Sequence, residues 1–286
     1  MVVLYLYAEV MGYTLATIKS LCSQGVEVHV VHWDVNKQTP YTFGHIPGVC
    51  FYQRSSFGLR ELIFFTKELS PDLVVVSGWQ DLGYVRCCWE LRQENRDVVV
   101  CFDDQWFGSA RQYAAQFLGG LGLFKRFFSH AWVAGPYQYE YAKRLGYSNR
   151  ELIDNLLSAD VDVFTGPPPR DIRYVKSEKR LLFVGRFAEV KGLHDLLEVW
   201  FNLGSRKRGW TLRLVGEGLL QVNSTDVEIV RFKSGSDLAR EFEHADFFIL
   251  PSRFEPWGVV VHEAALMGLP IIASSAVGAA SVFLIP

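Results

Sequence analysis

Residues 247–274 read FFILPSRFEPWGVVVHEAALMGLPIIAS, and this stretch decides the fold. The apolar run FFIL predicts a strand that ends in a proline-rich corner, VVVHEAALMG then predicts a helix, and PIIAS predicts a second strand. A strand, a helix and a strand in this order are typical of a βαβ unit with parallel strands. The stretch also places Glu255 on the turn and Glu263 inside the helix, with Gly258 between them. Other motifs in the sequence must therefore indicate which ligand these two carboxylates would bind.

The same alternation of strands and helices runs through the whole sequence of 286 residues. Strand-like runs such as VVLYLYA (2–8) and DVVVCFDD (97–104) alternate with helical patterns such as TLATIKSLCSQG (14–25). The alternation pauses at TGPPPRDIRYVKSEKR (165–180), whose prolines and charges predict a linker. We therefore predict an α/β fold with two Rossmann-like domains, residues 1–165 and residues 166–286.

Composition excludes several classes of function. The net charge of −2 and the pI near 6.4 show no basic excess of the kind that binds nucleic acid. The sequence contains no run of 18 apolar residues, so it predicts no membrane-spanning helix. The N-terminus MVVLYLYAEV is interpreted as a first strand and not as a signal peptide. The five cysteines are odd in number and lack metal-ligand spacing, which favours a reduced, cytosolic protein without a bound metal.

The stretch LLFVGRFAEVKG (181–192) predicts a strand that ends just before Arg186 and Lys191. In open α/β sheets, ligands bind beyond the carboxyl ends of the strands. A guanidinium can donate bidentate hydrogen bonds to two oxygens, and an ammonium is a compact positive charge. The two cations therefore suit a diphosphate. A solvated loop with unrelated basic residues is the alternative interpretation.

The turn and helix of the opening stretch could hold the remaining parts of such a ligand. Gly258 lets the backbone approach a ligand where a helix begins, and the free N–H groups of a helix start form an anion site. Glu263, about one and a half turns into the helix, could accept two ribose hydroxyls, and Glu255 could hold sugar hydroxyls. Each glutamate alone could be an ordinary solvent-facing or turn residue. Their combination with Arg186 and Lys191 favours a nucleotide-sugar site.

At this point the sequence resembles a known family. PSRFEPWGVVVHEAALMGLPIIAS resembles the signature of two glutamates separated by seven residues in the retaining glycosyltransferase family 4, which has the GT-B fold, and FVGRFAEVKG resembles the same family's Gly-Arg and Lys-Gly segment. The resemblance covers about residues 180–286. It implies two Rossmann-like domains whose parallel sheets face each other across a cleft, an N-terminal acceptor-side domain and a C-terminal domain that binds the nucleotide-sugar.

Family members run about 70–100 residues further and so complete the helical cover of the second sheet. We therefore expect the second domain to be truncated and incomplete, and we expect possible self-association through its uncovered apolar surface.

The resemblance also implies a role for each matching residue. Family members transfer a sugar with retention to an acceptor hydroxyl; they need no metal and no cofactor, and the nucleotide-sugar is a substrate. The implied roles are diphosphate neutralisation by Arg186 and Lys191, backbone capping of the diphosphate by Gly258, Val259 and Val260, ribose binding by Glu263, contact with the donor sugar by Glu255, and proximity of Phe232 to the base.

The first domain matches the family only in its pattern of strands and helices, and it adds three further candidate features. The loop AEVMGY keeps only Gly12 of the paired glycines that approach the donor phosphates. Asp103 and Asp104 follow a predicted strand, and they either act on the acceptor hydroxyl as a base or positioning group, or cap a turn. The stretch GLGLFKRFFSHAW (120–132) is either an interfacial membrane patch, suited to a lipid-linked glycan acceptor, or a helix packed on its own sheet.

These observations predict a glycosyltransferase of polysaccharide or glycoconjugate biosynthesis that acts in the cytoplasm, with peripheral contact to the inner face of the cell membrane. The alternatives are a catalytically inactive nucleotide-sugar-binding or partner protein, and a nucleotide-sugar epimerase of the same fold. A glycosidase is a weaker alternative, because its carboxylate pair needs no phosphate site.

Overall fold

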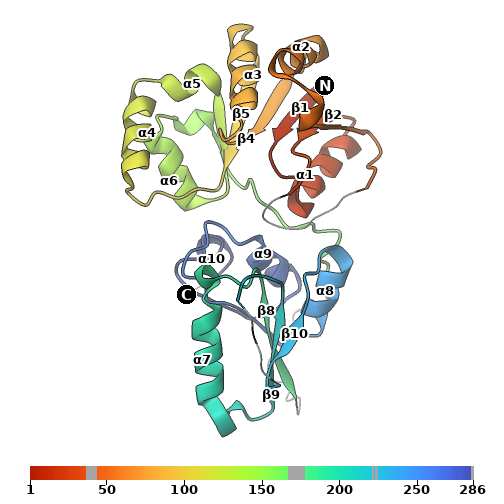
Figure 1. Cartoon of the computed structure of the whole chain (residues 1–286), viewed down its shortest axis with the longest axis vertical. Coiled ribbons are helices and arrows are strands. Elements are labelled where there is room, and N and C mark those ends of the chain that lie inside the picture. Colours follow the sequence, from red (N-terminus) through yellow and green to blue (C-terminus); the bar gives the residue numbers. More distant parts are fainter. Residues whose placement is uncertain (37–43, 167–177, 221, 223–224, 285–286) are drawn as a thin grey trace. The chain divides into compact units, whose positions relative to one another are not determined.

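The computed structural model describes residues 1–36, 44–166, 178–220, 222 and 225–284. It divides the chain into two compact units, Met1–Ser158 and Ala159–Pro286, each built on a parallel sheet with helices packed on it (Figure 1). The predicted α/β architecture with two Rossmann-like domains is therefore confirmed. Most of the predicted linker, residues 167–177, lies outside the described residues.

The first unit contains a seven-stranded sheet in the order β3-β2-β1-β4-β5-β6-β7, and all its strand pairs are parallel. The strands are β1 (Val2–Tyr7), β2 (Glu27–His32), β3 (Val49–Gln53), β4 (Leu73–Ser77), β5 (Asp97–Phe102), β6 (His130–Val133) and β7 (Leu152–Ile153). The helices are α1 (Gly12–Ser23), α2 (Leu59–Leu69), α3 (Leu82–Gln93), α4 (Ala110–Gly120), α5 (Leu123–Phe127) and α6 (Pro136–Arg144).

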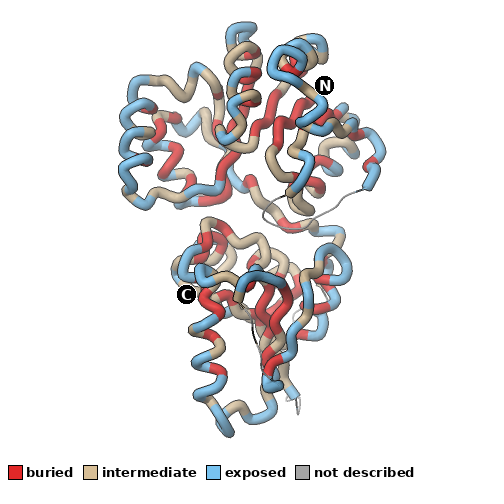
Figure 2. The backbone as a smooth tube through the Cα atoms, viewed as in Figure 1, coloured by how far each residue is buried: buried red, intermediate tan, exposed pale blue. Residues whose placement is uncertain are grey.

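Successive side chains of a strand point to opposite faces of the sheet, and β1 shows this plainly. Leu4 and Leu6 belong to a buried cluster that includes residues of α2 and α3, whereas Val3 and Tyr5 belong to a second cluster that includes residues of α1. Helices therefore cover both faces, and the central strands are buried along their length (Figure 2). This is why β1 and the other central strands are continuous apolar runs in the sequence.

Two strands of the first unit were not predicted. Both β3 and β7 lie at an edge of the sheet, where one side of a strand is unpaired and the apolar pattern is weak. The helical segment between β5 and β6 is divided into α4 and α5 at Gly122, whose φ of +72° interrupts a helix.

The second unit contains a five-stranded parallel sheet in the order β10-β9-β8-β11-β12. The strands are β8 (Lys179–Val184), β9 (Trp210–Val215), β10 (Glu228–Val230), β11 (Phe247–Leu250) and β12 (Ile271–Ala273). The helices are α7 (Leu193–Leu203), α8 (Gly235–Glu243), α9 (Val259–Leu266) and α10 (Ala280–Phe283).

The strand order of the second sheet reverses at β8. The chain runs outward from β8 to β9 and β10 on one side, and it then returns to place β11 and β12 on the other. In an open α/β sheet, such a reversal opens a crevice beyond the carboxyl ends of the two central strands, and ligands bind there. The stretch that decides the fold, β11-α9-β12, begins with one of these two central strands.

Candidate functional site

The loop after β8 carries the two cations that we predicted to bind a diphosphate. Arg186 is exposed, whereas Lys191 lies at the end of the short helical turn η3 (Glu189–Lys191). Gly192 follows with a φ of +67°, and a Cβ atom there would lie only 2.0 Å from the carbonyl oxygen of Pro251. Glycine is thus required at this position, because it lets the loop after β8 touch the backbone that follows β11.

The loops after β8 and β11 are also joined by hydrogen bonds and by an ion pair. The N–H groups of Arg253 and Phe254 donate to the carbonyl oxygen of Val190, at 2.8 and 3.1 Å. The ammonium of Lys191 pairs with the carboxylate of Glu255, and the two side chains are only 16% and 11% exposed. The structure therefore brings together one predicted phosphate ligand and one predicted sugar ligand.

The backbone around Glu255 is held by a segment close to the end of the described chain. Glu255 forms an isolated parallel bridge with Val277, and the N–H of Gly278 donates to the carbonyl oxygen of Glu255 at 3.1 Å. The N–H of Ala279 donates to the carbonyl oxygen of Trp257 at 2.8 Å. The turn that carries Glu255 is consequently fixed on both of its sides, by the loop after β8 and by residues 277–279.

Helix α9 begins directly after this turn. Gly258 precedes it with a φ of +89°, and a Cβ atom there would lie 3.0 Å from Cγ of Glu255. Val259 and Val260 are the first residues of α9, so their N–H groups have no acceptor within the helix. These N–H groups, together with the helix dipole, form a site for an anion next to Glu255.

Glu263 lies in the middle of α9 and is half-buried. Within the part of the chain that the structure describes, its carboxyl group has no hydrogen-bond or ion-pair partner. Burial raises the pKa of this carboxyl to about 8. An unsatisfied carboxyl of this kind is stabilised by a ligand that donates hydrogen bonds to it, as the two hydroxyls of a ribose would.

The two predicted phosphate cations differ in their present contacts. The guanidinium of Arg186 has no hydrogen-bond or ion-pair partner among the described residues, whereas Lys191 is engaged with Glu255. An anion could thus approach Arg186 without displacing a side chain. To bind Lys191 it must compete with the carboxylate of Glu255.

A third loop, the one after β9, packs against the loop after β8 and was only weakly indicated by the sequence. The N–H of Phe187 donates to the carbonyl oxygen of Glu217 at 2.8 Å, and a Cβ atom on Gly218 would lie 2.3 Å from the carbonyl oxygen of Phe187. The stretch LVGEG alone indicates only a strand followed by a glycine turn. Its contribution to the site, which is to support the backbone around Arg186, depends on this contact.

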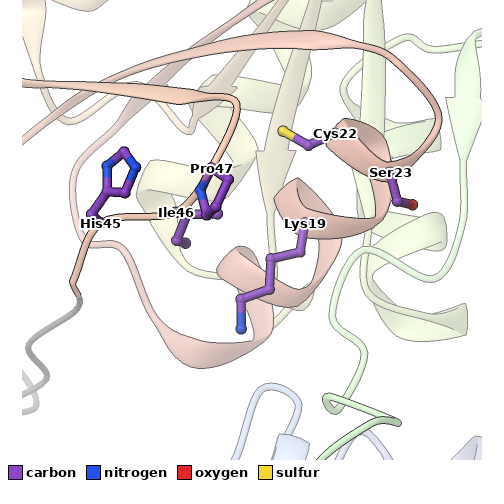
Figure 3. A pocket seen from close by; sticks show the side chains of 6 residues that line it. All are labelled: Lys19, Cys22, Ser23, His45, Ile46 and Pro47. Atoms are coloured by element: carbon purple, nitrogen blue, oxygen red, sulfur yellow. The ribbon is translucent and has the colours of Figure 1, made fainter.

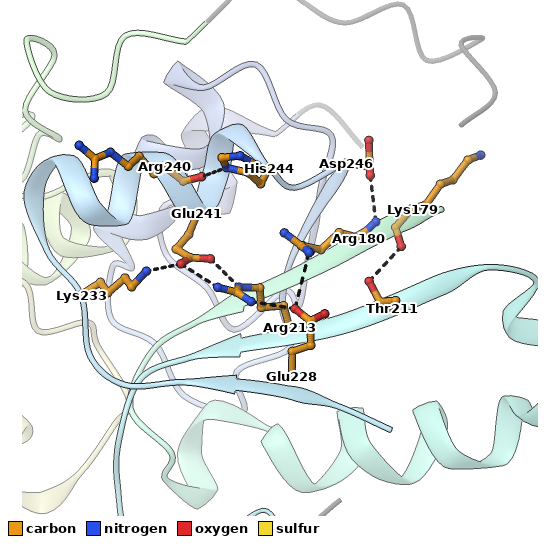
Figure 4. Close-up of polar contacts among 10 residues, drawn as sticks. All are labelled: Lys179, Arg180, Thr211, Arg213, Glu228, Lys233, Arg240, Glu241, His244 and Asp246. Carbon is orange, nitrogen blue, oxygen red and sulfur yellow. Dashed lines mark hydrogen bonds and ion pairs between the residues drawn. The ribbon is translucent and has the colours of Figure 1, made fainter. Parts of the chain in front are cut away.

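Phe232 lies on the loop between β10 and α8, and the neighbouring Lys233 anchors that loop to α8 (Figure 4). Lys233 forms an ion pair with the buried carboxylate of Glu241, which also accepts two hydrogen bonds from Arg213, at 2.5 and 3.0 Å. Burial alone would raise the pKa of Glu241, but the hydrogen bonds from Arg213 and Lys233 lower it to about 2. A permanently charged cluster therefore fixes the loop that carries Phe232.

The remaining predicted residues belong to the first unit. Gly12 is the first residue of α1, and Asp103 and Asp104 follow β5 with exposed side chains. Burial raises the pKa of Tyr13, and the charges of Asp103 and Glu9 raise it further, so the start of α1 and the end of β5 are electrostatic neighbours. We did not single out Tyr13 from the sequence, in which it is one of 12 tyrosines.

A shallow hollow of about 360 Å³ opens beside α1 in the first unit (Figure 3). It contains none of the residues that we predicted to bind a donor or an acceptor, and it is lined by Lys19, Cys22, Ser23, His45, Ile46 and Pro47. Among the described residues, no group of three or more His, Cys, Asp and Glu side chains is placed to hold a metal ion. In the same residues, no helix has the length and apolar character needed to cross a membrane.

Comparison with known proteins shows what the second unit is similar to. Residues 178–284 match the family described as Glycosyl transferases group 1. A glycogen synthase of Mycobacterium tuberculosis is 35% identical over 105 residues, which cover 33% of this chain and 25% of that protein. The matching segment thus spans about a quarter of the length of that relative. The segment that is similar to this family includes the loops after β8 and β11.

Solved structures resemble the chain over nearly its whole length. The sucrose-phosphate synthase from Thermosynechococcus elongatus has a TM-score of 0.67 and 19% identity, and the match covers 100% of this chain and 84% of that one. The HepE protein of Anabaena, in complex with UDP and glucose, has a TM-score of 0.68 and 18% identity, with 98% and 82% covered. These likenesses confirm the predicted GT-B fold.

Proposed function

We propose that this protein is a retaining glycosyltransferase of family 4, which moves a sugar from a nucleoside diphosphate-sugar to an acceptor hydroxyl. One observation carries the proposal: the loop after β8, with Lys191, contacts the loop after β11, with Glu255, and helix α9 begins directly after that second loop. This arrangement lies within the segment that matches the glycosyl transferases group 1 family.

The diphosphate of the donor would meet Arg186, Lys191 and the first N–H groups of α9. Negative charge grows on the diphosphate as the bond between it and the sugar breaks, so cations and a helix start placed there stabilise the transition state. Arg186 is available for this contact, since no described residue pairs with it. In this proposal the cations supply the charge compensation for which other enzymes use a bound metal ion.

The sugar of the donor would meet Glu255. When the diphosphate draws Lys191 away from Glu255, the freed carboxylate can accept hydrogen bonds from sugar hydroxyls. Binding of the donor thus exchanges one charge-assisted contact for two new ones, each of a kind that contributes about 1.5–3 kcal/mol. The Lys191–Glu255 pair keeps both groups satisfied while the donor is absent.

The nucleoside would be held further along the same crevice. Glu263 would accept the ribose hydroxyls, and Phe232 would lie near the base. In the first unit, Gly12 would approach the donor, and Asp103 or Asp104 would receive the proton of the acceptor hydroxyl or position it.

The acceptor that we propose is a sugar or a lipid-linked glycan, in polysaccharide or glycoconjugate biosynthesis. We place the protein in the cytoplasm with peripheral contact to the inner face of the membrane. A lipid-linked acceptor would require such contact.

Calorimetric titration of the protein with UDP, GDP and ADP tests the donor site. We expect one of the three nucleotides to bind, and we expect Glu263→Ala to weaken that binding. Glu198→Ala, which removes an exposed glutamate from α7 of the same unit, is the matched control and should bind like the parent. Equal binding by Glu263→Ala and the parent would exclude the ribose assignment.

Product analysis tests the reaction. With the nucleotide-sugar and an acceptor, NMR should show that the new glycosidic bond has the anomeric configuration of the donor. Inversion would refute the retaining mechanism. A changed nucleotide-sugar in the absence of any acceptor would instead identify an epimerase.

A further inference from the structure

We propose that the outer face of α4 binds the surface of an anionic lipid bilayer. This face, called here the lipid face, consists of Tyr113, Phe117 and Leu118 on α4, Phe107 before the helix and Leu121 directly after it, all of which are exposed. Phe117 and Leu121 are 70% and 61% exposed, although large apolar side chains are usually buried. The inference deepens the membrane contact of the proposed function, but it rests on α4 and not on the donor site.

The apolar side chains are gathered by the helix and are not scattered. Tyr113, Phe117 and Leu121 are spaced four residues apart, and Leu118 follows Phe117, so they form one stripe along the helix and its C-terminal end. Figure 2 shows α4 as a largely exposed element of the first unit. A contiguous apolar stripe of this kind marks an interaction surface.

The orientation of α4 is fixed by its opposite side. A Cβ atom on Gly119 would lie 2.4 Å from the carbonyl oxygen of Leu145, so the helix backbone packs directly against the end of α6. Gln112 is buried; it accepts a hydrogen bond from the N–H of Phe107 at 2.8 Å and donates one to the carbonyl oxygen of Gln105 at 2.6 Å. Because polar and small residues occupy the inner side, the apolar stripe must face outward.

The residues that follow α4 do not form the interfacial membrane patch that was one of our two interpretations of residues 120–132. Phe124 and Phe127 pack against the core of the first unit, and Phe128 is only 2% exposed. The segment 123–128 is therefore packed on its own sheet, as the alternative interpretation held. The exposed apolar surface lies earlier in the chain, on Phe107 and α4.

The charge of α4 and of the residues that follow it suits anionic lipid, and the exposed Asp103 and Asp104 lie before this stretch. The sequence contains no aspartate or glutamate from residue 105 to residue 139. Arg111 and Arg126 are exposed, and neither has an ion-pair partner among the described residues. An amphipathic surface flanked by arginines gains both apolar burial and attraction to anionic headgroups, the latter about 1 kcal/mol for each cation near the surface.

An aromatic and a further cation flank the stripe. The guanidinium of Arg144 lies 4.6 Å from the ring centroid of Trp106, and the Trp106 ring stands edge-on to that of Tyr113 at 5.1 Å. Trp and Tyr favour the boundary between headgroups and acyl chains, since one end of each ring system is polar. The same charges disfavour a second copy of the chain as the partner, because a twofold contact sets each surface against itself and would oppose like charges.

Vesicle flotation of the whole protein tests the inference. We expect binding to phosphatidylcholine vesicles that contain about one quarter phosphatidylglycerol, and binding that is weaker by on the order of tenfold with phosphatidylcholine alone. Phe117→Ser/Leu121→Ser should reduce binding by at least about tenfold. Arg111→Gln/Arg126→Gln should abolish the preference for the anionic vesicles.

The first unit offers a matched control for the loss of apolar surface. Phe64 on α2 and Leu82 on α3 are 67% and 80% exposed, so Phe64→Ser/Leu82→Ser removes the same side-chain types from other helices. Equal vesicle binding by this control and by Phe117→Ser/Leu121→Ser would overturn the inference. So would a parent protein that fails to bind vesicles, or one whose dimer dissociates on Phe117→Ser/Leu121→Ser. Nucleotide titration of the same variants reports separately on the proposed function.

Discussion

Lys191 and Glu255, which are 64 residues apart in the sequence, form an ion pair that joins the loop after β8 to the loop after β11. Both side chains are mostly buried, so neither charge is fully solvated when the other is removed. The pair has two consequences that can be measured separately, one for stability and one for donor binding.

Breaking the pair should destabilise the protein. Lys191→Met leaves the buried carboxylate of Glu255 without its ammonium partner, and losing one partner of a buried pair costs about 3–5 kcal/mol. Urea unfolding should show this loss, and Lys191→Met/Glu255→Gln should recover part of it. The exposed pair of Arg253 and Asp195 is the control, and Arg253→Met should cost less than about 1 kcal/mol. Additive effects of the Lys191 and Glu255 substitutions would contradict a direct coupling.

The same two substitutions should separate binding from transfer. Lys191→Met should weaken nucleoside diphosphate binding by on the order of tenfold, because one charge-assisted contact is lost. Glu255→Gln should reduce kcat for transfer more than it reduces nucleotide affinity, since the carboxylate faces the sugar in our proposal. Titration and a transfer assay measure the two quantities. A Glu255→Gln variant that loses affinity and rate equally would refute this division of roles.

Glu263 should make both stability and binding depend on pH. Its folded-state pKa of about 8 is above the usual value of 4.5, so the folded protein binds more protons than the unfolded chain between these values. Stability should therefore fall as the pH rises from about 5 to about 8, and Glu263→Gln should remove most of this dependence. Urea unfolding at several pH values measures it.

When a bound nucleotide-sugar donates hydrogen bonds from its ribose hydroxyls to Glu263, the carboxyl group of Glu263 should ionise, since a carboxylate that accepts hydrogen bonds has a lowered pKa. Nucleotide binding at pH 7 should then release close to one proton, because Glu263 is mostly protonated in the free protein. Calorimetry in two buffers of different ionisation enthalpy detects the release. Glu263→Gln should show none, and an equal release from the variant would assign the proton to another group.

Gly192 should tolerate a side chain much less well than another glycine of similar backbone conformation. Gly192 and Gly235 have φ values of +67° and +56°, but a Cβ atom at Gly235 would meet no atom within 4 Å. Gly235→Ala should therefore cost only the backbone strain, about 1 kcal/mol, whereas Gly192→Ala must also move the Pro251 backbone. Thermal unfolding and nucleotide titration should both rank Gly192→Ala as the more harmful change. Equal losses would show that the two loops are not held in contact there.

The cluster around Glu241 should set the resistance of the second unit to acid. The pKa of Glu241 is lowered to about 2, so its contribution to stability is complete above about pH 4.5 and is lost as the pH falls towards 2. Glu241→Gln should reduce stability near neutral pH by on the order of 2–3 kcal/mol and should flatten the acid dependence. Acid titration followed by circular dichroism checks this. An unchanged acid midpoint in Glu241→Gln would show that other carboxylates dominate.

Much of the fold could be predicted because its central strands are buried on both faces and therefore appear as apolar runs. The strands β3 and β7 could not, since β3 has a single buried residue and β7 has only two residues, neither of them buried. Helix α4 shows a different difficulty. Its apolar residues recur at helical spacing, which usually indicates the buried side, but Gln112 and Gly119 lie inside and Phe117 faces solvent.

Most site residues of the second unit could be named because they lie next to a strand end, a glycine or a helix start, and Glu263 could be named from its spacing to Glu255. Their contacts could not be derived in the same way. The ion pair between Lys191 and Glu255 depends on which strands are neighbours, and the state of Glu263 depends on how much protein surrounds α9. The support of Arg186 by the loop after β9 is likewise a contact between backbones, and side-chain patterns carry no signal for it.

The hold of residues 277–279 on the turn that carries Glu255 has a consequence for synthesis on the ribosome. Units of a chain fold in the order in which they emerge, and about 5–20 residues are added each second. Glu255 leaves the ribosome before the segment that fixes its backbone, so for about one to a few seconds the turn lacks that support. The turn that carries Glu255 is thus among the last parts of the described chain to mature. If our proposal for Glu255 holds, a nascent chain stalled shortly before Val277 should have folded its first unit while still binding no donor.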